Sequence, residues 1–138
     1  MIHEGGNVIN ASSTFLGKAR ESLEDARQAH AGGRYNSSAN RSYYACLQAA
    51  IHALIAAGVT PPGRGTHWDH GFVQGQFNGL LIHRRHQYSS DLRTILSQNA
   101  DLRVDADYTS KPVSEIASLR ALRRAERFVA AIVQREGA

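Results

Sequence analysis

The chain has 138 residues, of which 42% are hydrophobic, and it carries a formal net charge of +4. A chain of this length folds as one domain and buries about two-thirds of its unfolded surface. No apolar run approaches the roughly 18 residues of a membrane-spanning helix, and the polar start Met1–Asn10 lacks the features of a signal peptide. We therefore expect a cytoplasmic protein without a membrane segment. Cys46 is the single cysteine, which excludes an intrachain disulfide.

The basic residues are unusually uniform, because 14 of the 16 are arginine. A guanidinium group binds phosphate through two parallel hydrogen bonds, and a chain with a pI near 9.6 attracts polyanions. A GC-rich genome produces the same excess of arginine without any function. Composition alone therefore neither establishes nor excludes a phosphate-containing partner.

We expect residues 1–11 to form a flexible N-terminus and residues 12–138 to form one helical domain. The first helix is predicted from Ser13 to His30, because apolar residues recur there every three or four positions. Its buried stripe comprises Phe15, Ala19, Leu23 and Ala26. The pair Gly32-Gly33 then breaks the chain.

A second helix is predicted from Tyr35 to Ala57, followed by Gly58, a residue typical of helix ends. The Pro-Gly-rich loop Val59–Gly65 separates it from Thr66-His67-Trp68-Asp69. These four residues have the spacing of a capping box, which predicts that a third helix begins there. Glycines at positions 71, 75 and 79 predict that this helix is short or irregular.

The basic cluster His83-Arg84-Arg85-His86 is expected at a helix end or in a loop. A fourth helix follows, from a cap at Ser90 to about Asp105, and a last helix starts at Ser114. The apolar stripe of the last helix is predicted to comprise Ile116, Leu119, Leu122, Val129, Ile132 and Val133. No segment alternates as strands do, so the sequence predicts an all-α, up-and-down bundle of four to five helices.

The most informative segment is Arg34–Ala50, which contains two adjacent tyrosines. Aromatic side chains lose rotamer freedom in a helix, so packing has to compensate. Helical spacing directs Tyr35, Ala39, Tyr43, Ala50 and Leu54 toward a core. The same spacing aligns Arg41, Ala45, Gln48, His52 and Ile55 on a second face. We expect polar chemistry on that second face.

The pattern Arg-Tyr-x-x-Ser-x-x-Arg-Ser-Tyr-Tyr-Ala, which begins at Arg34, resembles the HEPN family of small helical nucleotide-binding domains. Three further matches occur in the same order as in that family: Thr66-His67 with Gly71, Arg103–Tyr108 and Ala125–Val129. Together the matches span Phe15 to Ile132. The resemblance implies a HEPN-like bundle.

Many members of that family are metal-independent ribonucleases in which an arginine and a later histidine, from both chains of a dimer, act together. The resemblance assigns the arginine to Arg41, and the histidine of the nearest pattern falls on Gln48. An amide does not exchange a proton near neutral pH, so this departure affects catalysis more than phosphate binding. His52, one turn further along, is the candidate for a replacement general base, and a packed or surface histidine is the alternative.

Two other histidine patterns give weaker evidence for a catalytic or metal site. Arg64 and His70 also show the family spacing, but Arg64 lies in the Pro-Gly-rich loop, and we interpret the match as coincidence. His67 and His70 are three residues apart, yet no Cys, Asp or Glu completes a recognisable set of metal ligands. We therefore expect no metal and no cofactor.

Beyond Arg41, the predicted nucleic-acid contacts are Arg84 and Arg85 of the basic cluster and Arg120 and Arg124 of the last helix. The alternative for each is a solvated or ion-paired side chain. The expected structural motif, which the resemblance places between the second and fourth helices, consists of Tyr43, Tyr44, Arg103, Asp107 and Tyr108.

We therefore predict a HEPN-like homodimer that binds RNA or a nucleotide phosphate. The resemblance further implies a toxin–antitoxin or defence pair with a nucleotidyltransferase-type partner, with weak catalysis because of Gln48. One alternative is a metal-independent endoribonuclease toxin that uses Arg41 and a displaced histidine. The other is a non-catalytic structural dimerisation module.

Overall fold

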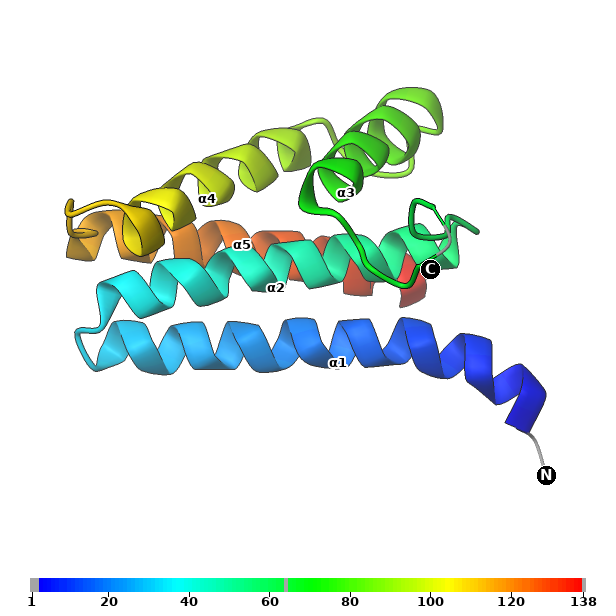
Figure 1. Cartoon of the computed structure of the whole chain (residues 1–138), viewed down its shortest axis with the longest axis horizontal. Coiled ribbons are helices and arrows are strands. Elements are labelled where there is room, and N and C mark those ends of the chain that lie inside the picture. Colours follow the sequence, from blue (N-terminus) through cyan, green and yellow to red (C-terminus); the bar gives the residue numbers. More distant parts are fainter. Residues whose placement is uncertain (1–2, 64, 138) are drawn as a thin grey trace.

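The computed structural model describes residues 3–63 and 65–137, with side chains from residue 14 to residue 136 apart from residue 64. Every regular element in this part of the chain is helical (Figure 1). The elements are α1 (His3–Ala31), α2 (Tyr35–Ala56), α3 (His70–Gln76), the π-helix η1 (Phe77–Arg84), α4 (Asp91–Tyr108) and α5 (Glu115–Gly137). The predicted all-α bundle is confirmed. None of these described helices is both long and apolar enough to cross a membrane.

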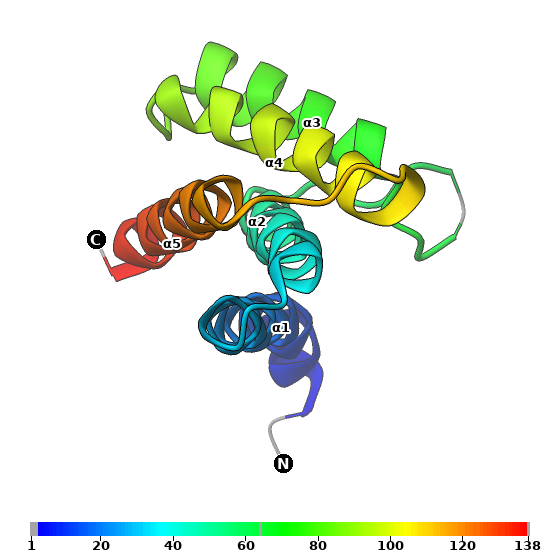
Figure 2. The same cartoon turned by 90° about the vertical axis from the view of Figure 1, so that its left-hand side faces the viewer.

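Helix α2 is the central element of the bundle. Figure 1 shows it between α1 and the layer that contains α3 and α4, and Figure 2 shows α5 beside it. The chain reverses between α1 and α2 at Gly33, whose φ of 75° is readily adopted only by glycine. The Arg34 N–H then donates to the Ala29 carbonyl at 2.8 Å and closes the turn. This short connection makes α1 and α2 antiparallel neighbours.

The core surrounds α2 and combines a few large side chains with many alanines. Its largest fully buried apolar members are Tyr43, Phe77, Phe128, Leu54, Leu81, Leu96 and Ile132. The Phe77 ring centre lies 5.2 Å from that of Tyr88 and 5.1 Å from that of Phe128, so η1 is packed against α5. Each such buried side chain stabilises the fold by about 1.5–3 kcal/mol.

Two helices begin at residues other than those predicted. Helix α1 starts at His3 instead of Ser13. Helix α3 starts at His70, because the carboxylate of Asp69 caps it and accepts the Phe72 N–H at 2.9 Å. The predicted capping box, which placed Asp69 inside the helix, is thus wrong. The limits 1–11 and 12–138 for a flexible segment and a domain stay predictions.

The predicted irregularity between the second and fourth helices is confirmed. Helix α3 continues directly into the π-helical turns of η1, and the basic cluster 83–86 ends this element. Helix α4 runs to Tyr108, further than predicted, and the Ser90 side chain makes no capping hydrogen bond. The Ser114 hydroxyl does cap α5, since it accepts a main-chain N–H of the first turn at 3.1 Å.

The predicted apolar stripe of α5 is buried at Leu122, Val129 and Ile132, but its first two positions are exposed. Ile116 and Leu119 are 62% and 37% exposed, whereas the small residues Ser118 and Ala121 are fully buried. The Ser118 hydroxyl lies 2.8 Å from Nδ1 of His30 on α1. Small side chains at these positions let α5 approach its neighbours closely, which turns the larger ones outward.

An ion-pair network joins α1 to α5. The Glu126 carboxylate accepts Arg27 Nε at 2.9 Å and Arg123 Nη1 at 2.8 Å. Partial burial disfavours the charge of Glu126, but the two hydrogen bonds outweigh it and hold the pKa of this carboxyl below its ordinary value. The network therefore stabilises the ionised form of Glu126.

Candidate functional site

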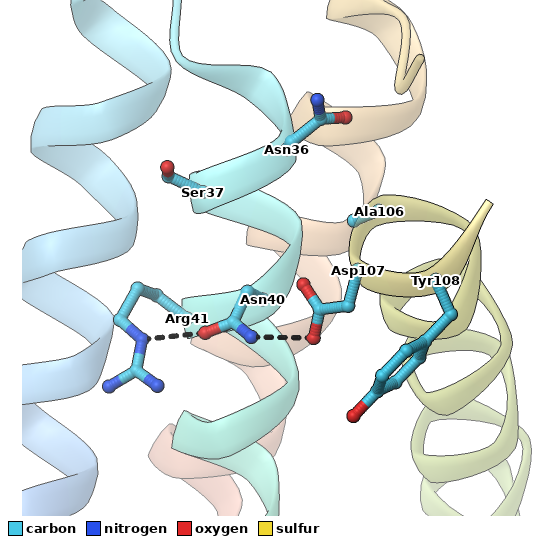
Figure 3. Close-up of a pocket in the computed structure, with 7 residues that line it drawn as sticks. All are labelled: Asn36, Ser37, Asn40, Arg41, Ala106, Asp107 and Tyr108. Atoms are coloured by element: carbon cyan, nitrogen blue, oxygen red, sulfur yellow. Dashed lines mark hydrogen bonds between the residues drawn. The ribbon is translucent and has the colours of Figure 1, made fainter. Parts of the chain in front are cut away.

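A groove of about 630 Å³ lies between the first turns of α2 and the last turn of α4 (Figure 3). It is lined by Asn36, Ser37, Asn40, Arg41, Ala106, Asp107 and Tyr108. Two segments far apart in the sequence thus form one polar surface. This surface combines a cation, a carboxylate, amide groups and an aromatic ring.

Arg41 is held in this groove by contacts that leave its terminal nitrogens unused. Its Nε donates to Asn40 Oδ1 at 2.9 Å, and its guanidinium carbon lies 5.0 Å from the centre of the Tyr44 ring. Asn40 in turn donates from Nδ2 to Asp107 Oδ2 at 2.9 Å, as Figure 3 shows. Among the described residues, no hydrogen bond or ion pair engages the two terminal nitrogens of Arg41. They can therefore bind an anion in bidentate geometry.

Arg103 packs among three tyrosines where α4 meets α2. Its guanidinium carbon lies 5.0 Å, 5.8 Å and 5.7 Å from the ring centres of Tyr43, Tyr44 and Tyr108. Its Nη1 also lies 3.5 Å from Asp107 Oδ2. Burial raises the pKa of the Tyr43 hydroxyl, which therefore stays protonated. The five residues of the expected structural motif are thus gathered in one place.

His70 is brought to the same tyrosines by α3. Its ring centre lies 5.7 Å from those of both Tyr43 and Tyr44. Burial, together with the neighbouring charge of Arg103, lowers the pKa of His70 although Asp69 opposes this. The sequence offered no sign of this position, because its spacing from Arg64 and His67 suggested other interpretations and the contact with α2 is purely tertiary.

Gln48 and His52 do not line the groove. The Gln48 amide faces α1, where with its nitrogen turned inward it donates to Lys18 O at 3.0 Å and to the Ser22 hydroxyl at 2.7 Å. His52 is only 2% exposed, and its Nε2 lies 2.7 Å from Glu136 Oε1 near the end of α5. The structure therefore separates both residues from the groove that contains Arg41.

The four other predicted phosphate contacts also lie away from Arg41. Arg84 is exposed at the end of η1, and Arg85 donates from Nη1 to the Ala57 carbonyl at 3.3 Å. Because Ala57 follows α2 directly, this end is about 24 Å from Arg41 along the helix axis.

On α5, Arg120 is exposed, whereas Arg124 donates from Nε to Asn99 Oδ1 at 2.7 Å. Arg120 lines a separate hollow of about 360 Å³ against the side of α4. The predicted basic residues therefore occupy three places and do not form one surface with the groove. No group of three or more potential metal ligands occurs in the described part of the chain.

The fold and this site define a small helical-bundle domain with a polar groove between α2 and α4. The family model described as HEPN domain matches residues 12–136, nearly the whole chain. The chain belongs to the HEPN family, whose functions are related to nucleotides and RNA. Comparison with curated proteins found no match.

Proposed function

We propose that this HEPN domain binds RNA or a nucleotide phosphate in the groove between α2 and α4. The observation that carries the proposal is Arg41, whose two terminal nitrogens have no protein partner among the described residues. Tyr108, at the same groove, is 73% exposed and offers a ring on which a nucleobase can stack. Arg41 thus offers a contact for a phosphate and Tyr108 a contact for a base in the same groove.

Ribonuclease activity is weak or absent in this proposal. The position at which the nearest family pattern has histidine holds Gln48, which cannot shuttle a proton and is bonded to α1. Membership of the family supports a role in a toxin–antitoxin or defence pair, beside a nucleotidyltransferase-type partner, in the cytoplasm. Genome neighbourhood tests this pairing, since an adjacent nucleotidyltransferase gene supports it.

A homodimer is part of the proposal. Large apolar side chains are exposed near the end where α4 passes into α5, at the yellow and orange side of Figure 1. Apart from Tyr108, which the groove uses, they are Val104, Ile116 and Leu119. Exposed large apolar side chains are candidates for a contact surface. Light scattering of wild type and of Ile116→Glu tests this part, with a shift to monomer expected for the variant.

A second candidate function is a metal-independent endoribonuclease. The observation that favours it is His70, an imidazole that contacts the same Tyr44 ring as Arg41 and is the candidate for the displaced histidine. A purely structural dimerisation module would need neither residue.

The test measures binding and cleavage together. Fluorescence anisotropy with a labelled single-stranded decauridylate gives the affinity of wild type, of Arg41→Ala and of the control Arg20→Ala, an exposed arginine of α1. Loss of one charge-assisted bidentate contact predicts about tenfold to 100-fold weaker binding for Arg41→Ala and no change for the control. Equal affinities of all three proteins would refute the groove. Robust cleavage by wild type in the same samples would favour the second candidate.

A further inference from the structure

The Tyr44 ring is surrounded by three nitrogen-rich side chains from three different helices. Arg41 from α2, Arg103 from α4 and His70 from α3 lie 5.0 Å, 5.8 Å and 5.7 Å from its centre. We call these four residues the Tyr44 cluster. The cluster adjoins the groove, because Tyr44 follows Arg41 by three residues and Arg103 precedes Asp107 by four. On both helices it is therefore about one turn, or roughly 5 Å, further along.

The two carboxylates next to the cluster already form contacts of their own. Asp107 is shared between Arg103 and Asn40, and Asp69 is occupied as the cap of α3. His67 also lowers the pKa of His70. Arg103 Nε is buried and has no hydrogen-bond partner among the described residues. This unpartnered donor belongs to a guanidinium that contacts the same ring as Arg41 and His70, and a bound anion would satisfy it.

We propose that the Tyr44 cluster is a second phosphate subsite, which takes the backbone phosphate next to the one in the groove and uses His70 as a proton-dependent ligand. This inference rests on the proposed function, because the groove has to hold the first phosphate. Single-stranded RNA fits both places at once, since its phosphates repeat along the strand while its bases remain free to stack on Tyr108. A mononucleotide with one phosphate can fill only one of the two.

The protonation of His70 is coupled to phosphate binding. In the free protein, burial and the charge of Arg103 lower the pKa of His70, His67 adds to this, and Asp69 opposes it, so the neutral imidazole predominates near neutral pH. A bound phosphate favours the imidazolium and raises this pKa. Binding therefore takes up a proton, and affinity has to increase as the pH falls through the pKa of the complex.

The experiment is a pH series of decauridylate binding by anisotropy, from about pH 8 to about pH 5.5, over the range in which circular dichroism reports a folded protein. We expect wild-type affinity to rise about tenfold toward the acidic end, as one charge-assisted hydrogen bond forms. His70→Gln should keep the affinity of the neutral form and lose most of this rise. His70→Arg, whose charge is permanent, should bind tightly at every pH. A residue with only a packing role would not produce this opposite pair of effects.

Two results overturn the subsite, and they differ from failure of the groove. If Arg41→Ala weakens binding while His70→Gln retains the wild-type pH profile, the groove stands and the subsite is refuted. If uridine 3'-monophosphate shows the same dependence on His70 as decauridylate, the second-phosphate assignment is refuted. If wild type binds no RNA, or Arg41→Ala changes nothing, both proposals fail. A rise in the NMR-measured pKa of His70 on addition of decauridylate is the direct positive result.

Discussion

Substitution of Arg124 by alanine tests whether this arginine is a structural residue or an RNA ligand. Asn99 is fully buried, and its Oδ1 accepts Arg124 Nε at 2.7 Å while its Nδ2 donates to the Ala121 carbonyl at 3.1 Å. Burial lowers the pKa of Arg124, although not far enough to remove its charge at neutral pH. The side chain thus satisfies a buried acceptor with a charged donor. Arg124→Ala leaves that acceptor without this donor.

The expected loss of stability is about 2 kcal/mol. A hydrogen bond to a charged group contributes about 1.5–3 kcal/mol, and partial exposure of the guanidinium argues for the lower half of that range. For a chain of this size, such a loss lowers the melting temperature by roughly 5–10 °C. Urea unfolding followed by circular dichroism measures the free energy directly. Arg120→Ala, one turn earlier and exposed, is the matched control and should change stability by less than about 0.5 kcal/mol.

A double-mutant cycle with Asn99→Ala decides between a specific contact and a general loss of packing. Residues that share a buried hydrogen bond should show a coupling of about 1 kcal/mol or more. Wild-type stability of Arg124→Ala, or strict additivity in the cycle, would refute the structural role. Weaker RNA binding by a fully stable Arg124→Ala would instead support the original prediction of a phosphate contact.

Three further outcomes follow from the same structure. Arg84→Ala combined with Arg85→Ala should lower the slope of log affinity against log salt by about 1.4 for RNA long enough to reach both ends of α2, and an unchanged slope would mean that the pair binds no phosphate. His52→Gln should destabilise the fold by about 1–2 kcal/mol through its contact with Glu136 and leave RNA affinity unchanged, so weakened binding by a stable variant would contradict a structural role. Because the folded-state pKa of Glu126 is lowered, its stabilisation is present above the ordinary glutamate pKa and is lost as the pH falls through the folded value. The stability difference between wild type and Glu126→Gln should therefore shrink in acid, and a difference that persists there would show that ionisation is not its cause.

Much of the fold follows from information that lies within one or two helical turns. Apolar spacing predicted α2 almost to the residue, and Gly58, with a φ of 87°, ends it as expected. Periodicity alone also predicted the burial of Tyr43 and the class of the fold. The start of α1 was predicted ten residues too late, because Ser13 is typical of a helix start yet lies inside the helix. The start of α3 was predicted too early, because Thr66 can cap a helix as Asp69 does. Asp69 was recognised as a helix-start residue but was placed inside α3 instead of at its cap.

The candidate site depended on information that no local pattern contains. Helical spacing placed Arg41, Gln48 and His52 on one face of α2, but it could not show that α1 and α5 cover the last two. Packing decides which residues of α2 are covered. Neighbouring helices surround most of this central helix, so few of its side chains remain accessible. The same packing brings His70 to Tyr44 and directs Arg124 to Asn99. The sequence by itself therefore determined the family, the bundle and the arginine of the groove. Only the tertiary structure decided which histidine contacts the same tyrosine ring as that arginine, because the relative rotation and position of whole helices bring distant residues together.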